Sequence, residues 1–233
     1  MTRPVVLFSS GLDSAVLLLQ TAQRYGGAQP VYIRSGLAWE RHEQAMAERF
    51  LARLPPATGV RNLVVLDVDM RDVYPATHWA VRGEAPAFDS PDEDVYLEGR
   101  NIVLLSKTAV FAARTASTLI VVGPLAGNPF PDARPEFFEA MSGALSLGLD
   151  TPVAIEAPFL ALDKSGVIRA GVDLGVPFEL TLSCMQPVPR SPEGPALHCG
   201  RCSKCRERAD AFAEAGLIDP AQATTNFQAP TSN

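Results

Sequence analysis

Four cysteines are the residues of this chain whose types and spacing point most directly to chemistry. Cys184 stands alone, and Cys199, Cys202 and Cys205 follow as a CxxCxxC run. Four thiolates match the tetrahedral preference of zinc, and gaps of two residues let successive sulfurs turn toward one point. We therefore predict a zinc site with these four ligands. Because a zinc ion with four protein ligands has no open position for water, its role is expected to be structural.

Two other interpretations of the cysteines stay open. Disulfides would require an oxidising compartment, but the apolar run at 5–8 is short and leads into a Ser/Gly turn, unlike a signal peptide. No apolar run reaches the length of a membrane span either. We expect a cytoplasmic protein that does not enter a membrane. His198, beside Cys199, is the alternative candidate for one ligand position.

The composition and net charge of the chain indicate what kind of molecule it binds. The 233 residues are 47% hydrophobic, enough to bury one substantial core, and the net charge is −6. Nonspecific binding to DNA or RNA depends on surplus Lys and Arg, so we expect a small-molecule partner and no direct nucleic acid binding. A local basic group surrounds the cysteines, and it either offsets the charge of a thiolate-bound zinc or forms a solvated face. Its members are Arg190, Arg201, Lys204, Arg206 and Arg208.

A second candidate site is the stretch from Ser9 to Ser14, which directly follows the first apolar run and leads into an amphipathic pattern beginning near Asp13. Backbone N–H groups at a helix N-terminus bind anions, and small residues let phosphate oxygens approach. A carboxylate would repel bare phosphate, so Asp13 predicts a bridging Mg²⁺. The alternative is that Asp13 and Ser14 are ordinary helix caps. No lysine follows Gly11, so this is not the phosphate loop of kinases and GTPases.

The elements that must position these residues alternate between apolar runs and amphipathic stretches. Continuous apolar strands predict a parallel sheet covered on both faces, and therefore a doubly wound α/β fold. We expect strands at 5–8, 31–33, 63–68 and 119–122, and helices after Asp13, at 40–54 and at 102–115.

The rest of the chain divides by composition. Residues 1–180 are expected to form the nucleotide-binding α/β domain, 181–220 the zinc-binding segment and 221–233 a polar tail. The stretch at 73–97 is rich in Pro, Asp and Glu and predicts a surface loop or lid.

Ser9 to Ser14 resembles SGGLDS, the signature of the PP-loop ATP pyrophosphatases. These are adenine nucleotide alpha hydrolase-like enzymes that cleave ATP between the α and β phosphates. Further segments occur in the order seen in the 7-cyano-7-deazaguanine synthase family of the queuosine pathway, and Lys164 opens a helix after Pro158. The segments are Arg41-His42-Glu43, Glu98-Gly99-Arg100-Asn101, the FPDARPEF run at 130–137, and TLSC at 181–184 with HCGRCSKC at 198–205.

The chain also departs from the family pattern. Ser10 replaces a glycine, which is costly if the backbone there needs positive φ. Glu98 stands for proline and Ala133 for cysteine. The run Gly127-Asn128-Pro129 stands where the family tends to have D.SG.

The resemblance implies ATP-dependent conversion of 7-carboxy-7-deazaguanine and ammonia to 7-cyano-7-deazaguanine. Two rounds of adenylation would give an amide and then the nitrile, releasing AMP and pyrophosphate, and the enzyme would be a homodimer. The cofactors implied are ATP, Mg²⁺ and Zn²⁺. Residues implied to bind nucleotide are Phe8, Ser9, Ser10, Gly11, Leu12, Asp13, Ser14, Arg100 and Asn101; the catalytic set is Asp13, Ser14 and Lys164; the substrate set is Asp132, Arg134 and Glu136.

Residue types alone leave other interpretations open. Lys164 suits a surface lysine, residues 99–101 an ordinary turn and cap, and residues 130–137 a solvated loop. His42 and His78 are possible proton shuttles, but we assign neither that role. Two further functions remain: an adenylating ligase that joins a deazapurine carboxylate to another amine, such as a protein, and an inactive nucleotide-binding module.

Overall fold

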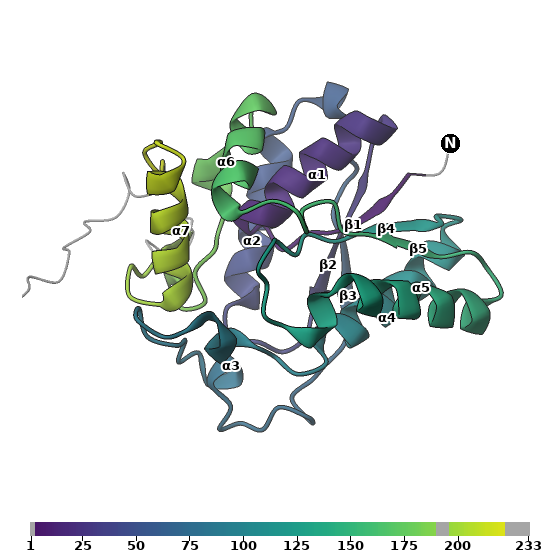
Figure 1. Ribbon diagram of the computed structural model, residues 1–233, viewed down its shortest axis with the longest axis horizontal. Coiled ribbons are helices and arrows are strands. Elements are labelled where there is room, and N and C mark those ends of the chain that lie inside the picture. The colour runs from purple at the N-terminus through teal and green to yellow at the C-terminus, as the bar shows by residue number, and fades with distance from the viewer. Residues whose placement is uncertain (1–2, 190–195, 222–233) are drawn as a thin grey trace, which may run out of the picture.

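The computed structural model describes residues 3–189 and 196–221. Its centre is a five-stranded parallel sheet (Figure 1) with the strand order β3-β2-β1-β4-β5. The order reverses between β1 and β4, which is where doubly wound proteins bind ligands. The strands are β1 Val5–Leu7, β2 Gln29–Arg34, β3 Val64–Asp67, β4 Leu119–Val121 and β5 Ala154–Glu156.

Helices cover both faces of this sheet (Figure 1). On one face a core cluster joins side chains of four helices to the sheet: α1 (Leu12–Tyr25), α2 (Glu40–Arg53), α6 (Lys164–Asp173) and α7 (Ser203–Glu214). On the other face a second cluster joins the sheet to α4 (Arg100–Arg114) and α5 (Pro135–Leu149).

The strands read as continuous apolar runs because both of their faces are buried. Val6 and Phe8 pack into the first cluster, whereas Val5 packs into the second, and all three are at most 2% exposed. Successive side chains of a strand point to opposite faces, so every position needs an apolar residue. The predicted doubly wound α/β fold is confirmed.

The remaining elements are short. A two-stranded antiparallel sheet pairs β6 (Val188–Pro189) with β7 (Ala196–Leu197). The other short helices are η1 Pro56–Thr58, α3 Trp79–Arg82, η2 Asp92–Val95, η3 Pro131–Ala133 and η4 Phe178–Leu180.

The stretch at 73–97 contains α3 and η2 and is docked on the cysteine segment. Ala87 forms an isolated bridge with Cys202, and Ser203 N donates to Pro86 O at 3.1 Å. Arg206 Nη1 donates to Phe88 O at 2.6 Å. This stretch is therefore held to the start of α7 by backbone contacts and by the side chain of Arg206.

Strand β5 and helix α5 were not among the elements expected from the sequence. Of the tail predicted at 221–233, residues 222–233 lie outside the described residues, as does Arg190 of the basic group. Among the described helices, none has both the length and the apolar character needed to cross a bilayer.

Candidate active site and metal centre

The turn between β1 and α1 has an unusual backbone at Ser10. Its φ is 62°, in the left-handed region that favours glycine. Two contacts hold this conformation: Ser10 Oγ donates to Glu43 O at 3.0 Å, and Ser10 O accepts from Leu182 N at 2.9 Å. The turn is thus tied both to α2 and to the segment that leads into the cysteines.

A cavity of about 260 Å³ opens at the carboxyl ends of β1, β2 and β4. One part of its lining is polar, with Ser9, Asp13, Ser14, Arg100 and Asn101 side by side. The other part is apolar and is suited to a flat ring such as a purine. The apolar lining includes Leu7, Phe8, Val31, Ile33, Leu104, Leu105, Val122 and Phe138.

We call the stretch from Ser9 to Ser14 the phosphate loop, and its side chains, together with Phe8, divide into two groups. Phe8, Ser9, Asp13 and Ser14 line the cavity, whereas the side chains of Ser10 and Leu12 are buried in the protein. Gly11 is the N-cap of α1, and a Cβ added there would lie 3.3 Å from Ser9 Oγ. The hydroxyls are linked to one another, with 3.3 Å between Ser9 Oγ and Ser14 Oγ.

A second cavity of about 370 Å³ adjoins the first and shares Ser9, Asp13, Arg100 and Gly123 with it. It extends to Lys164 at the start of α6 and to two residues of α7, Lys204 and Glu207. Other walls are aromatic or carboxylic and include Trp39, Glu43 and Phe130. The first cavity offers an apolar surface for a ring, and the second offers aromatic and charged side chains. The polar residues that the two cavities share could bind an anion between them.

A charge network connects the phosphate loop to α7. Lys164 Nζ lies 3.3 Å from Asp13 Oδ2 and also pairs with Glu207 Oε1. Lys204 Nζ donates to the other oxygen of Glu207 at 2.6 Å. Burial lowers the pKa of Lys164, but the carboxylates of Asp13 and Glu207 outweigh it and hold that pKa above its usual value. Lys164 therefore remains a cation.

Two buried polar atoms of the shared lining have no partner in the described structure, Asp13 Oδ1 and Arg100 Nε. Burial raises the pKa of Asp13, and the ammonium of Lys164 opposes that rise. A carboxylate oxygen that is buried beside a phosphate-sized space fits a magnesium ligand, because Mg²⁺ is bound through one or two carboxylates plus phosphate oxygens. Asp13 would hold such an ion, which would neutralise phosphate charge.

The three residues expected to bind substrate do not line the two cavities. Asp132 is buried, and its Oδ2 accepts from Asn101 N at 3.1 Å, while Asn101 Nδ2 donates to Asp132 O at 2.9 Å. Arg134 and Glu136 are exposed at the start of α5, and neither lines the two cavities. Asp132 thus holds the beginning of α4, and with it Arg100, in place.

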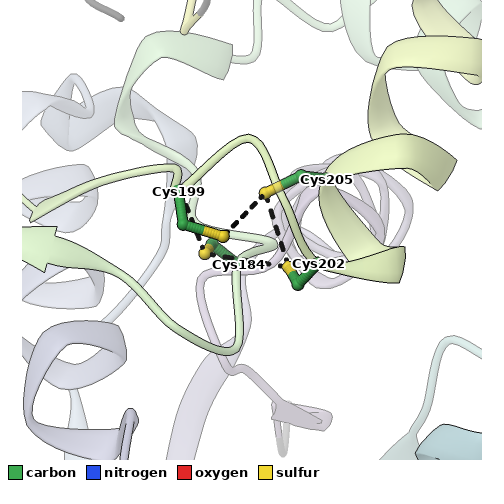
Figure 2. Close-up of side chains that lie close together, drawn as sticks. All are labelled: Cys184, Cys199, Cys202 and Cys205. Atoms are coloured by element: carbon green, nitrogen blue, oxygen red, sulfur yellow. Dashed lines mark hydrogen bonds between the residues drawn. The ribbon is translucent and has the colours of Figure 1, made fainter. Parts of the chain in front are cut away.

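The four cysteine sulfurs converge as Figure 2 shows, all within 4.8 Å of one another. Neighbouring Sγ atoms are 3.9 Å apart for Cys184 and Cys202, 3.9 Å for Cys199 and Cys205, and 3.5 Å for Cys202 and Cys205. Metal–sulfur bonds of about 2.3 Å in a tetrahedron require sulfurs about 3.8 Å apart, so the cluster fits one zinc ion. A disulfide would bring two sulfurs to about 2 Å, and all four cysteines are free.

Backbone amides support this cluster. Gln186 N and Cys199 N each donate to Cys184 Sγ at 3.3 Å, and Arg201 N donates to Cys199 Sγ at 3.4 Å. Such N–H···S bonds orient thiolates and offset their charge. His198 is not in the cluster, since its Nε2 accepts from Ser183 N at 3.1 Å and burial lowers its pKa to about 4.

Arg208, a member of the predicted basic group, is a buried anchor instead of a solvated or zinc-facing side chain. It is 2% exposed and makes two hydrogen bonds to the carboxylate of Asp219, at 2.7 and 2.8 Å. It also donates to Thr181 Oγ1 at 2.7 Å and to Phe178 O at 3.1 Å. These contacts attach α7 to the segment before Cys184.

Lys204, Glu207, Glu43 and Tyr32 belong to the site but were not assigned to it from the sequence. Lys204 and Glu207 flank Cys205 in the CSKCRE run, so their helical spacing from the ligands was visible. The sequence did not indicate that α7 lies with Glu207 directed toward Lys164.

The fold and the site together define an α/β protein of the PP-loop nucleotide-binding type with a cluster of four cysteines that could hold a metal ion. Residues 3–216 match the family model described as queuosine biosynthesis protein QueC. The chain belongs to that family.

Curated relatives extend over nearly the whole chain. A 7-cyano-7-deazaguanine synthase of Paramagnetospirillum magneticum is 34% identical, with 94% of this chain and 97% of the relative covered. A 7-cyano-7-deazaguanine synthase of Anaeromyxobacter dehalogenans is 36% identical, with 94% of this chain and 95% of the relative covered. Among solved structures, a 4-thiouridine synthetase with RNA and bound ATP has a TM-score of 0.47 and 14% identity over 92% of this chain and 50% of that one. That likeness is too low to bear on function.

Proposed function

We propose that this protein is an ATP-dependent ligase that converts 7-carboxy-7-deazaguanine and ammonia to 7-cyano-7-deazaguanine. A carboxylate is a poor electrophile, and transfer of AMP to its oxygen supplies a leaving group that ammonia can displace. A second adenylation, on the amide oxygen, then permits loss of that oxygen as AMP. The names of the relatives and the family match support this substrate.

The observation that carries the proposal is the meeting of Asp13 and Lys164 at the point where the two cavities join. In this proposal the first cavity holds ATP, with the purine ring against the apolar lining and the phosphates at the polar end. The second cavity holds the deazapurine. Its carboxylate would then face the α phosphate.

The roles follow from the charges and donors in the lining. Asp13 would hold Mg²⁺, while Ser9, Ser14 and Arg100 would bind phosphate oxygens. Lys164 would neutralise charge on the α phosphate or the departing pyrophosphate. These residues position and stabilise charge, and a covalent enzyme intermediate is not required.

The cysteine cluster is proposed to hold Zn²⁺ in a structural role, because its shell of four thiolates is complete. Free thiols in such a cluster agree with a cytoplasmic location, which we keep as a prediction. The homodimer, Arg134 and Glu136 as substrate contacts, and the domain boundary at residue 180 also remain predictions.

The proposal is tested by incubating the zinc-loaded protein with ATP, Mg²⁺, 7-carboxy-7-deazaguanine and ammonium. We expect AMP and pyrophosphate to form only when the acid is present, and a product with the mass of the nitrile. AMP that appears only with another amine would instead support the ligase that joins the deazapurine to a protein. Nucleotide binding without turnover would support the inactive module.

Asp13→Ala is the variant that tests the site assignment. We expect turnover to fall at least about 10²-fold, because removing a group that stabilises transferring phosphate costs several kcal/mol. The fold should be retained, since Asp13 is at the edge of a cavity. Asp173→Ala, at the far end of α6, is the control and should leave turnover unchanged. Wild-type activity in the Asp13 variant would refute the assignment.

A further inference from the structure

Five carboxylates line the second cavity, and four of them are committed to a cation or a helix end. Asp13 and Glu207 pair with lysines in the charge network, Asp92 lies 3.5 Å from a guanidinium nitrogen of Arg206, and Asp163 caps α6 by accepting from Gly166 N at 2.6 Å. The five are Asp13, Glu43, Asp92, Asp163 and Glu207.

Glu43 differs from the other four in its partners. Its Oε2 accepts a hydrogen bond from the Tyr32 hydroxyl at 2.9 Å, and the Trp39 side chain also hydrogen-bonds to it. Both partners are neutral, and among the described residues Glu43 has no ion pair. A carboxylate held by neutral donors keeps the ability to accept a proton, which an ion-paired carboxylate loses.

The position of Glu43 is fixed relative to the phosphate loop. The carbonyl of Glu43 accepts from Ser10 Oγ at 3.0 Å, so the first turn of α2 is attached directly to the turn after β1. The side chain lines the same cavity as Asp13, Arg100 and Lys164. Trp39 and Phe130 line it as well and provide apolar surface for a planar ring.

The two rounds of the proposed reaction differ in where protons are lost. Adenylation of the acid transfers AMP to an oxygen that already carries negative charge, so this step removes no proton, and ammonia loses one proton when it then displaces AMP. In the second round, the amide oxygen bonds to the α phosphorus and pyrophosphate leaves. Two N–H protons are then lost as the C≡N bond forms and the C–O bond to AMP breaks. The products from amide and ATP are nitrile, AMP, pyrophosphate and two protons.

We propose that Glu43 is the general base that removes these amide protons. This inference rests on the proposed function and adds a catalytic residue to it. The carboxylate takes the first proton as the amide oxygen attacks phosphorus, passes it to solvent through the cavity, and takes the second as AMP leaves. The Tyr32 hydroxyl orients the carboxylate.

The electrostatic surroundings agree with this role. Burial raises the pKa of Glu43 to about 7, the nearby Arg100 and the Tyr32 hydroxyl oppose that rise, and the carboxylate of Glu40 adds to it. Asp13 and Lys164 face the same space from α1 and α6. A general base works best when its pKa is near the working pH.

The test compares two half-reactions in Glu43→Gln, which keeps the shape of the side chain but cannot accept a proton. Exchange of labelled pyrophosphate into ATP, driven by 7-carboxy-7-deazaguanine without ammonium, measures adenylation of the acid, which removes no proton, and should stay within about threefold of wild type. Nitrile formation from the purified amide measures the other round and should fall about 10²- to 10⁴-fold. Glu48→Gln, on the exposed side of α2, is the matched control and should change neither.

The outcomes separate this inference from the proposed function. If wild type forms no nitrile, the proposed function fails. If wild type forms nitrile and Glu43→Gln forms it as fast, or loses both half-reactions equally, Glu43 is not the base. If Glu43→Gln does not fold, Glu43→Asp takes its place. In that variant we expect nitrile formation from the amide to fall by a smaller factor, while pyrophosphate exchange is retained.

The pH dependence of nitrile formation from the amide gives a second test of the role of Glu43. A residue that only supports the structure would not change the pH at which this rate decreases. The active form of Glu43 is deprotonated, so wild-type nitrile formation from the amide should decrease as the pH falls below about 7. Use of the amide avoids the titration of ammonium. In Glu43→Asp the decrease should occur at a different pH, and an unchanged profile would contradict the role.

Discussion

Ser10 shows how one residue of the site carries a conformational cost. Its φ of 62° places a side chain where the PP-loop signature has glycine. Ordinary L residues pay about 1 kcal/mol in this region, whereas glycine does not. The hydrogen bond from Ser10 Oγ to Glu43 O offsets part of that cost and is the contact that attaches α2 to the loop.

We expect Ser10→Ala to destabilise the protein more than Ser10→Gly does. Glycine relieves the backbone strain, so the free energy of unfolding should change by less than about 1 kcal/mol in either direction, because the hydrogen bond is lost at the same time. Alanine keeps the strain and loses the bond, so it should destabilise by about 1 kcal/mol or more. Urea unfolding of both variants measures the difference. A glycine variant less stable than the alanine variant would contradict this account.

Helix α7 is the element through which the metal centre reaches the active site. Cys202 is its N-cap and Cys205 lies in its first turn, and Glu207, two residues after Cys205, contacts Lys164. The far side of α7 is held by Arg208, which is buried against Asp219. With a metal bound at the proposed site, α7 would be fixed both by that metal and by a buried ion pair, and Lys204 and Glu207 would be presented in one orientation.

Arg208→Met should therefore weaken the attachment of α7. Removing one partner of a buried ion pair leaves the other charge uncompensated, which costs about 3–5 kcal/mol. We expect the midpoint of thermal unfolding to drop and ATP affinity to decrease as the Lys164–Glu207 contact loosens. Asp210→Asn, an exposed position on the same helix, is the control and should leave both values unchanged. Unaltered stability in Arg208→Met would show that this ion pair does not hold the helix.

At the scale of the whole molecule, contacts connect the cysteine segment to the carboxyl-end edge of the sheet, where the two cavities lie. The phosphate loop contacts Leu182, Lys164 contacts Glu207, and the stretch at 73–97 bridges to Cys202. In the proposed function, metal binding at one end and nucleotide binding at the other would therefore act on shared residues. Linkage requires that each ligand strengthen binding of the other if both favour the same arrangement.

We expect ATP with Mg²⁺ to slow the removal of zinc by a chelator about 5- to 100-fold, the range of a typical coupling between sites. Release of the metal can be followed with a colorimetric zinc indicator. In Glu207→Gln the protection should shrink, because this side chain joins Lys164 to α7. Equal release rates with and without nucleotide in the wild type would mean that the two sites are independent.

Local sequence patterns predicted the fold class, which the structure confirms, and also the four cysteines as metal ligands and the phosphate loop, which remain predictions. These features are local patterns: strands buried on both faces read as apolar runs, Cys199, Cys202 and Cys205 lie within one turn and helix start, and the loop joins one strand to the next helix. The family resemblance added Lys164, Arg100 and Asn101, which the structure brings to the same cavities.

Tertiary structure alone decided which distant side chains share the site. Glu43 and Glu207 come from helices far apart in the chain, and their roles depend on packing against Ser10 and Lys164. The family resemblance assigned Asp132 to the substrate set, and the fold shows in addition that its carboxylate accepts from Asn101 N. The physical reason is that a carboxylate's partners and burial set its charge and proton affinity, and both are properties of the folded chain.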